Sequence, residues 1–297
     1  MEREIWSELS QAICEVACRW KESPRFTHST ALIVRVHLWS ALHDRPTSWA
    51  CHAQNWDSRT RPSTLPDQST MSRRLGTAGF TTFMKAVSAR MAGKSGSSLL
   101  KRVDGKPLTV AAHSSDKHAT WGRGAGGKAR GFKMHSIWSA QPMPVQWIVT
   151  PLNVSEKPMA RRMIKRMGQS EKGGGGYLLA DGYYDSSELY DECAKIGYQL
   201  LAPRQHPGSG LGHHYVSDHR IRGIELLEPP ARINPFGPDL YRQRLQVERD
   251  LGNLTSFGGG LMNLPPWVRT MPRVRRWVWA KLLINAARIR CRRGIGA

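Results

Sequence analysis

The sequence predicts a mixed α/β protein that begins with a helical region, and two observations carry this prediction. Apolar residues from Ile5 to Trp20 recur at three- and four-residue steps, which is typical of an amphipathic helix. From about residue 99 onward, short strand-like runs come first and then alternate with helical stretches, a pattern that favours a mixed sheet flanked by helices. We therefore expect a helical N-terminal region over 1–98 and an α/β domain over 99–297.

In the N-terminal part, residues 30–43 form a second apolar segment that predicts a helix. A polar stretch with prolines over 52–68 predicts a loop, after which Ser69 or Thr70 would cap a third helix. Arg73 and Arg74 in the first turns of that helix would suit contacts with DNA. A solvated basic face is an equally good interpretation of these two arginines.

In the C-terminal part, residues 99–112 predict a strand, a turn and a further strand. The glycine run Gly173 to Gly176 separates the first predicted helix of this part from the strand after it. The later predicted elements, in chain order, are strands over 131–140 and 144–152, a helix over 155–167, a strand and turn over 177–185, a helix over 186–197, a strand over 198–204, an irregular stretch over 206–239, and helices over 240–254 and 273–293. The last of these helices is basic and amphipathic.

The charge balance of the chain indicates a polyanionic partner. The 297 residues hold 44 Lys and Arg against 23 Asp and Glu, a formal net charge of +21. Nucleic acid is the first expectation and an anionic membrane surface the second. The basic residues are dispersed along the chain, which suits a long groove better than a disordered basic arm.

A membrane location is disfavoured by the apolar segments. The N-terminus lacks an apolar signal core, and the apolar stretch over 277–287 is short and interrupted by Lys281. The five cysteines have no paired spacing, which argues against a disulfide framework and for a reducing compartment. We expect an intracellular, soluble protein. The cysteines are Cys14, Cys18, Cys51, Cys193 and Cys291.

Three acidic residues are candidate metal ligands. Asp104 and Asp181 each precede a glycine where a predicted strand gives way to a turn, although one Asp-Gly pair by itself is usually a plain turn. Glu248 lies in the helix over 240–254, where it could simply pair with Arg244 four residues earlier. Helical spacing places Tyr241, Arg244 and Glu248 on one face, a polar combination unexpected for a buried structural face. Phosphoryl transfer on DNA uses two divalent cations held by such oxygen ligands.

These residues resemble the signature of the DDE transposases of bacterial insertion sequences, which is Tyr, two residues, Arg, three residues, Glu, six residues and Lys. The chain matches at Tyr241, Arg244 and Glu248 and has Thr255 in place of the lysine. The segments around Asp104 and Asp181 are similar to the family's two aspartate regions. The resemblance covers roughly residues 70–290, and it leaves open whether the missing lysine impairs this copy or is replaced by a basic residue such as Arg249.

The resemblance implies an RNase H-like core with Asp104 on its first strand, Asp181 on its fourth strand and Glu248 on the following helix. It implies that these three acids bind Mg²⁺, or Mn²⁺, for hydrolysis at transposon ends and for attack of the freed 3′-OH on target DNA. In this family the Tyr and Arg of the signature contact DNA, which assigns that role to Tyr241 and Arg244. The implied setting is a homodimer on double-stranded DNA in the bacterial cytoplasm, associated with the nucleoid.

Other motifs have weaker claims on function. Gly122, Gly127 and Lys128 fit the opening of a phosphate-binding loop, but Ala129 replaces the metal-binding hydroxyl. We interpret this segment as a basic hairpin loop that touches DNA through Lys128. Trp267 is expected in the core, with a stacking role near a displaced base as the alternative. A zinc site lacks Cys partners at the right spacing; the histidines considered for it are His113, His118, His135, His206, His213 and His214, of which His135 could support the carboxylate site.

Two further functions remain open at this point. The same carboxylates could serve an endonuclease that only hydrolyses DNA. The chain could also be a domesticated, non-catalytic DNA-binding protein or regulator, although such a protein gains nothing from three gathered carboxylates.

Overall fold

The computed structural model describes residues 1–93, 98–170, 174–207, 210–211, 215–228, 236–257 and 259–294. The chain forms two compact units, a helical unit of Met1–Lys94 with Asn253–Ala297 and a sheet unit of Ser95–Gly252. We expected residues 253–297 to belong to the α/β domain that follows residue 98. The structure groups them with the N-terminal helices instead.

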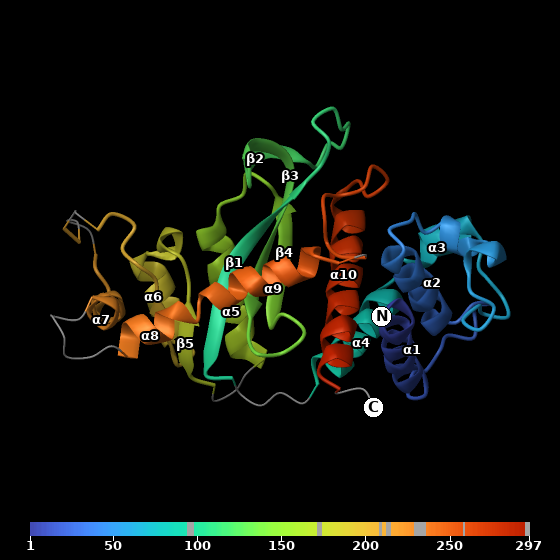
Figure 1. The fold of residues 1–297 in the computed structure, drawn as a ribbon, viewed down its shortest axis with the longest axis horizontal. Helices are drawn as coiled ribbons and strands as arrows, with labels where there is room; N and C mark the ends of the chain where they lie inside the picture. Colours follow the sequence, from blue (N-terminus) through green and yellow to red (C-terminus); the bar gives the residue numbers. More distant parts are fainter. Residues whose placement is uncertain are drawn as a thin grey trace. The chain divides into compact units, whose positions relative to one another are not determined.

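The helical unit is built around α10 (Met271–Arg292), which packs against α1 (Glu2–Ala17), α2 (Thr30–Leu42) and α4 (Ala78–Ala92) (Figure 1). The sequence pattern of α10 predicted a basic amphipathic helix, but most of its side chains are buried. Three of its basic residues, Lys281, Arg288 and Arg290, are buried as well and have partners inside the unit, whereas Arg273, Arg275 and Arg292 are exposed. Lys281 Nζ lies 2.6 Å from Asp44 Oδ1 and donates to two backbone carbonyls, and Arg290 pairs with Glu8.

Short elements complete this unit: η1 (Trp49–Cys51), η2 (Ala53–Asn55) and α3 (Gln68–Arg74). The cap of α3 is Asp67, whose Oδ1 accepts from Thr70 N at 2.6 Å, and not the Ser69 or Thr70 that the sequence suggested. Helix α3 therefore starts two or three residues earlier than a cap at Ser69 or Thr70 would place it. An aspartate accepts this bond at least as well as a hydroxyl residue.

The described part of the sheet unit contains a six-stranded sheet in the order β2-β3-β1-β5-β6, with β4 also paired to β3. The β1–β3 pair and the pairs of β2 and β4 with β3 are antiparallel, whereas β1–β5 and β5–β6 are parallel. The strands are β1 (Leu100–Thr109), β2 (Thr120–Gly124), β3 (Gly127–Trp138), β4 (Gln146–Pro151), β5 (Gly176–Leu179) and β6 (Tyr198–Leu201).

Strand β1 differs from the strand, turn and strand expected over 99–112. It runs unbroken through Asp104 and Gly105, which pair with Ser136 and His135 of β3. Because β3 provides backbone partners along this whole length, the local turn preference of Asp-Gly does not decide the conformation. Strand β2 adds one strand to the chain order, so Asp181 follows the fifth strand and not the fourth.

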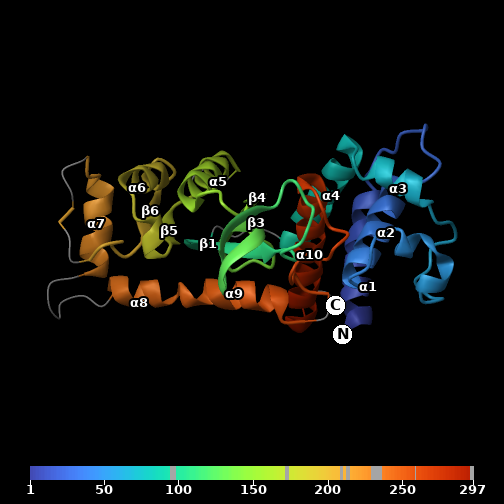
Figure 2. The same cartoon turned by 90° about the horizontal axis from the view of Figure 1, so that it is seen from above.

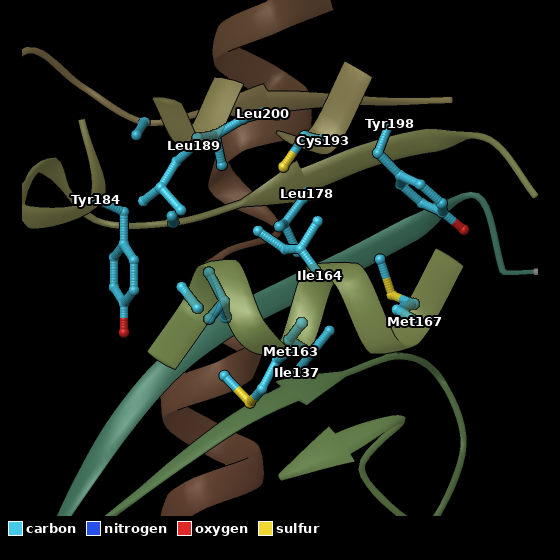
Figure 3. Close-up of a cluster of buried hydrophobic side chains, with 14 of the residues drawn as sticks. Ile137, Met163, Ile164, Met167, Leu178, Tyr184, Leu189, Cys193, Tyr198 and Leu200 are labelled. Carbon is cyan, nitrogen blue, oxygen red and sulfur yellow. The ribbon is translucent and has the colours of Figure 1, made fainter. Parts of the chain in front are cut away.

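Helices cover both faces of the sheet (Figure 2): α5 (Glu156–Ser170) and α6 (Ser187–Ala194) lie on one face, and α8 (Phe236–Arg242) and the start of α9 (Leu245–Thr255) on the other. The core beneath α5 and α6 joins Met163 and Ile164 to strand residues such as Leu178 (Figure 3). This burial fastens β5 to β1 and thereby positions the loop that follows β5.

The C-terminal half of this unit corrects two expectations. Helix α7 (Asp218–Leu227) lies within the stretch over 206–239 that was expected to be irregular. The single helix expected over 240–254 is two helices, because residues 243–244 form a turn between α8 and α9.

Among the described residues, no helix combines the length and the apolar character that crossing a membrane requires.

Candidate active site

Parallel pairing of β1 with β5 brings Asp104 and Asp181 together. The register aligns Arg102 with Leu179, the last residue of β5, so Asp104 and Asp181 each lie two residues beyond the final aligned pair. Neighbouring strands are about 4.8 Å apart. Strand β5 ends at Leu179, and Asp181 then caps η3 (Gly182–Tyr184) by accepting from Tyr183 N at 3.0 Å. The two carboxylates therefore share one edge of the sheet.

Both aspartates are electrostatically unusual. Burial raises the pKa of Asp104 to about 6, and the charges of Asp181 and Glu156 raise it as well, whereas the bond from Gly105 N and the charge of Arg244 oppose the rise. Burial also raises the pKa of Asp181, with the bond from Tyr183 N and the charge of Arg244 opposing. Repulsion between carboxylates held together in a partly buried place is typical of functional sites.

The signature residues lie beside these aspartates. Tyr241 donates its hydroxyl to Ala180 O at 3.0 Å, which fastens the α8–α9 segment to the end of β5. Arg244 Nη2 lies 4.0 Å from Asp181 Oδ2, and Arg244 Nη1 lies 3.0 Å from Glu248 Oε1. Arg244 thus stands between Asp181 and Glu248, whose side chain is 56% exposed.

A fourth carboxylate, Glu156, was not among the expected site residues. Its Oε1 lies 2.8 Å from Lys133 Nζ, and its Oε2 accepts from the buried Tyr184 hydroxyl at 2.7 Å. A Cβ at Gly105 would lie 3.1 Å from the Glu156 carboxyl, so this group rests against the backbone beside Asp104. Burial would raise the pKa of Glu156, but the bonds from Lys133 and Tyr184 outweigh it and the pKa is lowered.

No local pattern distinguishes Glu156 from an ordinary acidic residue in the first turn of a helix. His135, which was expected to support the site, is buried on β3 and its Nε2 lies 2.9 Å from Thr150 Oγ1. Burial lowers its pKa to about 4, so this imidazole is neutral near neutral pH.

The other expected DNA contacts lie in different places. Arg73 is exposed on α3. Arg74 is buried, donates to His28 O at 2.6 Å and lies 3.6 Å from Glu22, which gives it an internal structural role. Lys128 is exposed at the start of β3, with its Nζ 5.6 Å from the centre of the Trp121 ring.

The segment from Gly122 to Lys128 comprises the end of β2, the hairpin turn and the start of β3, and it does not lead into the helix that a phosphate-binding loop requires. His213 and His214 lie outside the described residues. Trp267 is 38% exposed and therefore not a core residue.

The oxygen donors at the sheet edge match the preference of Mg²⁺ and Mn²⁺. Asp104 and Asp181 both hold protons more tightly than usual, and a divalent cation would relieve their repulsion. In the described stretches, no three His, Cys, Asp or Glu side chains already stand close enough together to hold a metal ion. The donor chemistry of these carboxylates fits a divalent cation.

Comparisons with known proteins agree with this fold. A cryo-EM structure of the piggyBac transposase synaptic complex with hairpin DNA is similar, with a TM-score of 0.51 and 10% identity over 95% of this chain and 71% of that chain. A comparison with curated proteins yielded no match. The family model for the transposase DDE domain matches residues 101–284, more than half of the chain. The chain therefore belongs to the DDE transposase family.

Proposed function

We propose that this transposase cleaves DNA strands at transposon ends and joins the freed 3′-OH to target DNA in a metal-dependent reaction. The observation that carries the proposal is the β1–β5 pairing, which ends two residues before both Asp104 and Asp181, with Arg244 close to Asp181 and to Glu248. Carboxylates beside an arginine suit phosphoryl transfer better than acyl transfer, because the described part of this site offers no Ser or Cys nucleophile activated by a base.

In this proposal Asp104, Asp181 and Glu248 hold Mg²⁺, or Mn²⁺. When bound, the ions neutralise charge on the attacking and leaving oxygens of the phosphodiester. Arg244 orients the two carboxylates that it contacts and offers its guanidinium to a phosphate oxygen. Tyr241 holds the α8–α9 segment against Ala180, and its ring would face the DNA strand.

The proposed partner is double-stranded DNA, as transposon end and as target. The net charge of +21 supports it, and Arg73 and Lys128 are exposed cations that would contact phosphates. We further propose the insertion-sequence type, a homodimer that brings two ends together, and action in the bacterial cytoplasm at the nucleoid. Thr255 stands in place of the signature lysine, and Arg249 is the candidate substitute.

The test uses labelled DNA that carries the inverted repeats bordering the gene. Asp181→Asn should abolish cleavage with Mg²⁺ and leave DNA affinity equal or higher, since a negative charge near the phosphates is removed. Asp239→Asn removes the same charge from an exposed side chain of α8 and should cut normally. Cleavage by Asp181→Asn at the wild-type rate would refute the proposed site.

A second assay supplies precut ends and a plasmid target. Joining of the ends to the plasmid is the expected result. Cleavage without joining would indicate an endonuclease that only hydrolyses DNA. Binding without either reaction in the wild-type protein would indicate a DNA-binding protein.

A further inference from the structure

A cavity of about 310 Å³ lies within the helical unit, between α2, α3 and the first turns of α10. This volume is at the lower end of the range for small-molecule sites. The lining that matters for the argument comprises His37, Arg45, Gln68, Trp267, Arg273 and Arg276. None of these residues belongs to the carboxylate site of the sheet unit.

The cationic side of this cavity lacks internal counter-charge. Among the described residues, no ion pair joins Arg45, Arg273 or Arg276 to a carboxylate. Burial lowers the pKa of Arg276, and the like charge of Arg273 lowers it further. Three guanidinium groups gathered without an acid favour an anionic ligand, and guanidinium groups bind phosphate in a bidentate manner.

The helix direction adds to this preference. Arg273 and Arg276 lie in the first turns of α10, a helix of 22 residues whose N-terminal end reaches the cavity. The backbone N–H groups at such an end favour negative charge.

The remaining walls of the cavity suit a planar ligand group that also carries a hydrogen-bond donor. Trp267 and Trp277 line the cavity, and Trp267 is partly exposed. His37 is 5% exposed, and its Nε2 lies 3.4 Å from Arg276 O. A carbonyl only accepts, so Nε2 carries the proton and Nδ1 is an acceptor; this Nδ1 has no partner within the described structure.

We propose that this cavity binds one nucleoside phosphate, with its phosphate at Arg273 and Arg276 and its base against Trp267. A simple oxyanion would leave the tryptophan and the His37 acceptor unused, whereas a nucleotide engages all of them. The nucleotide could belong to a DNA strand, as an unstacked residue, or be free in solution. The first source rests on the function proposed above, and the second does not.

The experiment compares two labelled duplexes of equal length by fluorescence anisotropy, one fully paired and one with a single unpaired thymidine. The wild-type protein should prefer the second by roughly tenfold, the size that stacking of one base on an aromatic ring provides. Trp267→Ala and Arg273→Ala should remove this preference, and Trp267→Phe should keep most of it. Arg275→Ala is the matched control, since Arg275 is exposed on α10 and does not line the cavity.

Free thymidine 5′-monophosphate, titrated by calorimetry, separates the two sources. Its binding to the wild-type protein and loss in Trp267→Ala and Arg273→Ala, with no preference between the duplexes, would assign the cavity to a free nucleotide. A duplex preference that survives both substitutions would overturn the proposal. So would equal binding of both duplexes with no binding of the mononucleotide. Normal strand cleavage in that last case would leave the proposed function standing.

Discussion

At the scale of single residues, the electrostatics of the carboxylates distinguish this site from a set of turn aspartates. Asp104 holds its proton up to about pH 6 in the folded protein, against a usual pKa of 3.8. Glu156 has the opposite shift, because Lys133 and Tyr184 stabilise its charge. The pKa values of these two neighbouring acids are therefore shifted in opposite directions. Glu156 stays ionised, whereas the charge of Asp104 would be stabilised by a bound cation.

Asp104→Asn should raise the stability of the free protein near neutral pH. The native state retains this proton up to about pH 6 while the unfolded chain releases it near 3.8, so stability decreases as pH rises between these values. Removing the charge should stabilise the protein by about 1–2 kcal/mol at about pH 7, a value reduced for partial solvation. Urea denaturation of both proteins at about pH 7 and about pH 4 measures this difference in the free energy of unfolding. A gain that persists unchanged in acid would contradict this origin.

Tyr184→Phe should destabilise the protein by about 1–3 kcal/mol near neutral pH, because Glu156 loses a buried hydrogen-bond donor. The folded-state pKa of Glu156 is lowered, so this contribution is present above its usual 4.5 and is lost as pH falls through the folded value. Tyr183→Phe is the neighbouring control at an exposed tyrosine and should change little. Equal unfolding midpoints for the two variants would argue against a supporting role of Tyr184.

At the scale of elements, the site depends on the pairing of two strands that are distant in sequence. Strand β5 pairs with only the first residues of β1 and then ends, which leaves room at the edge for Asp181. The start of β5 tolerates no side chain, because a Cβ at Gly176 would lie 1.9 Å from Leu99 O. The φ of Gly176 is +139°, which also favours glycine.

Gly176→Ala should therefore disrupt the β1–β5 pairing, destabilise the protein by about 2 kcal/mol or more and reduce cleavage. Gly126→Ala is the matched control: its Cβ would meet nothing within 4 Å, and its stability should remain within about 0.5 kcal/mol of wild type. Thermal unfolding together with the cleavage assay provides both readouts. A Gly176→Ala protein with wild-type stability and activity would show that the register does not position Asp181.

At the scale of the whole molecule, the net charge of +21 bears on the association with DNA and not on the fold. Part of the basic content is internal, as in Arg74, Lys281 and Arg290, and these residues hold the helical unit together. The exposed lysines and arginines that have no carboxylate partner among the described residues, such as Lys128, are available to phosphates. Affinity for DNA should consequently depend on salt through the exposed set alone.

The logarithm of the association constant for duplex DNA should decrease steeply and linearly with the logarithm of salt concentration, as counterions are released. Lys128→Ala should reduce the magnitude of this slope by about 1 and weaken binding uniformly across sequences. Lys195→Ala provides the control. Lys195 already pairs with Glu192 at 3.1 Å, so this substitution should leave the slope unchanged. A flat salt dependence in the wild-type protein would refute a phosphate-binding groove.

The sequence by itself determined the features that follow from local patterns. Helical periodicity predicted the N-terminal helices, and the four-residue spacing of Arg244 and Glu248 predicted the contact between these two side chains. Local chemistry also singled out Asp104 and Asp181, but it assigned Asp104 to a strand end, whereas pairing with β3 keeps it inside a continuous strand. These patterns extend over a few residues, so they can be recognised in the sequence without knowledge of distant partners.

Only the tertiary structure decided which distant segments meet. It brought Glu156 against Gly105, buried Arg74 beside Glu22 and enclosed α10 among the N-terminal helices. It also assembled the cavity between α2, α3 and α10. Burial and partner choice depend on packing between residues separated by tens to hundreds of positions, and a local pattern carries no information about that packing.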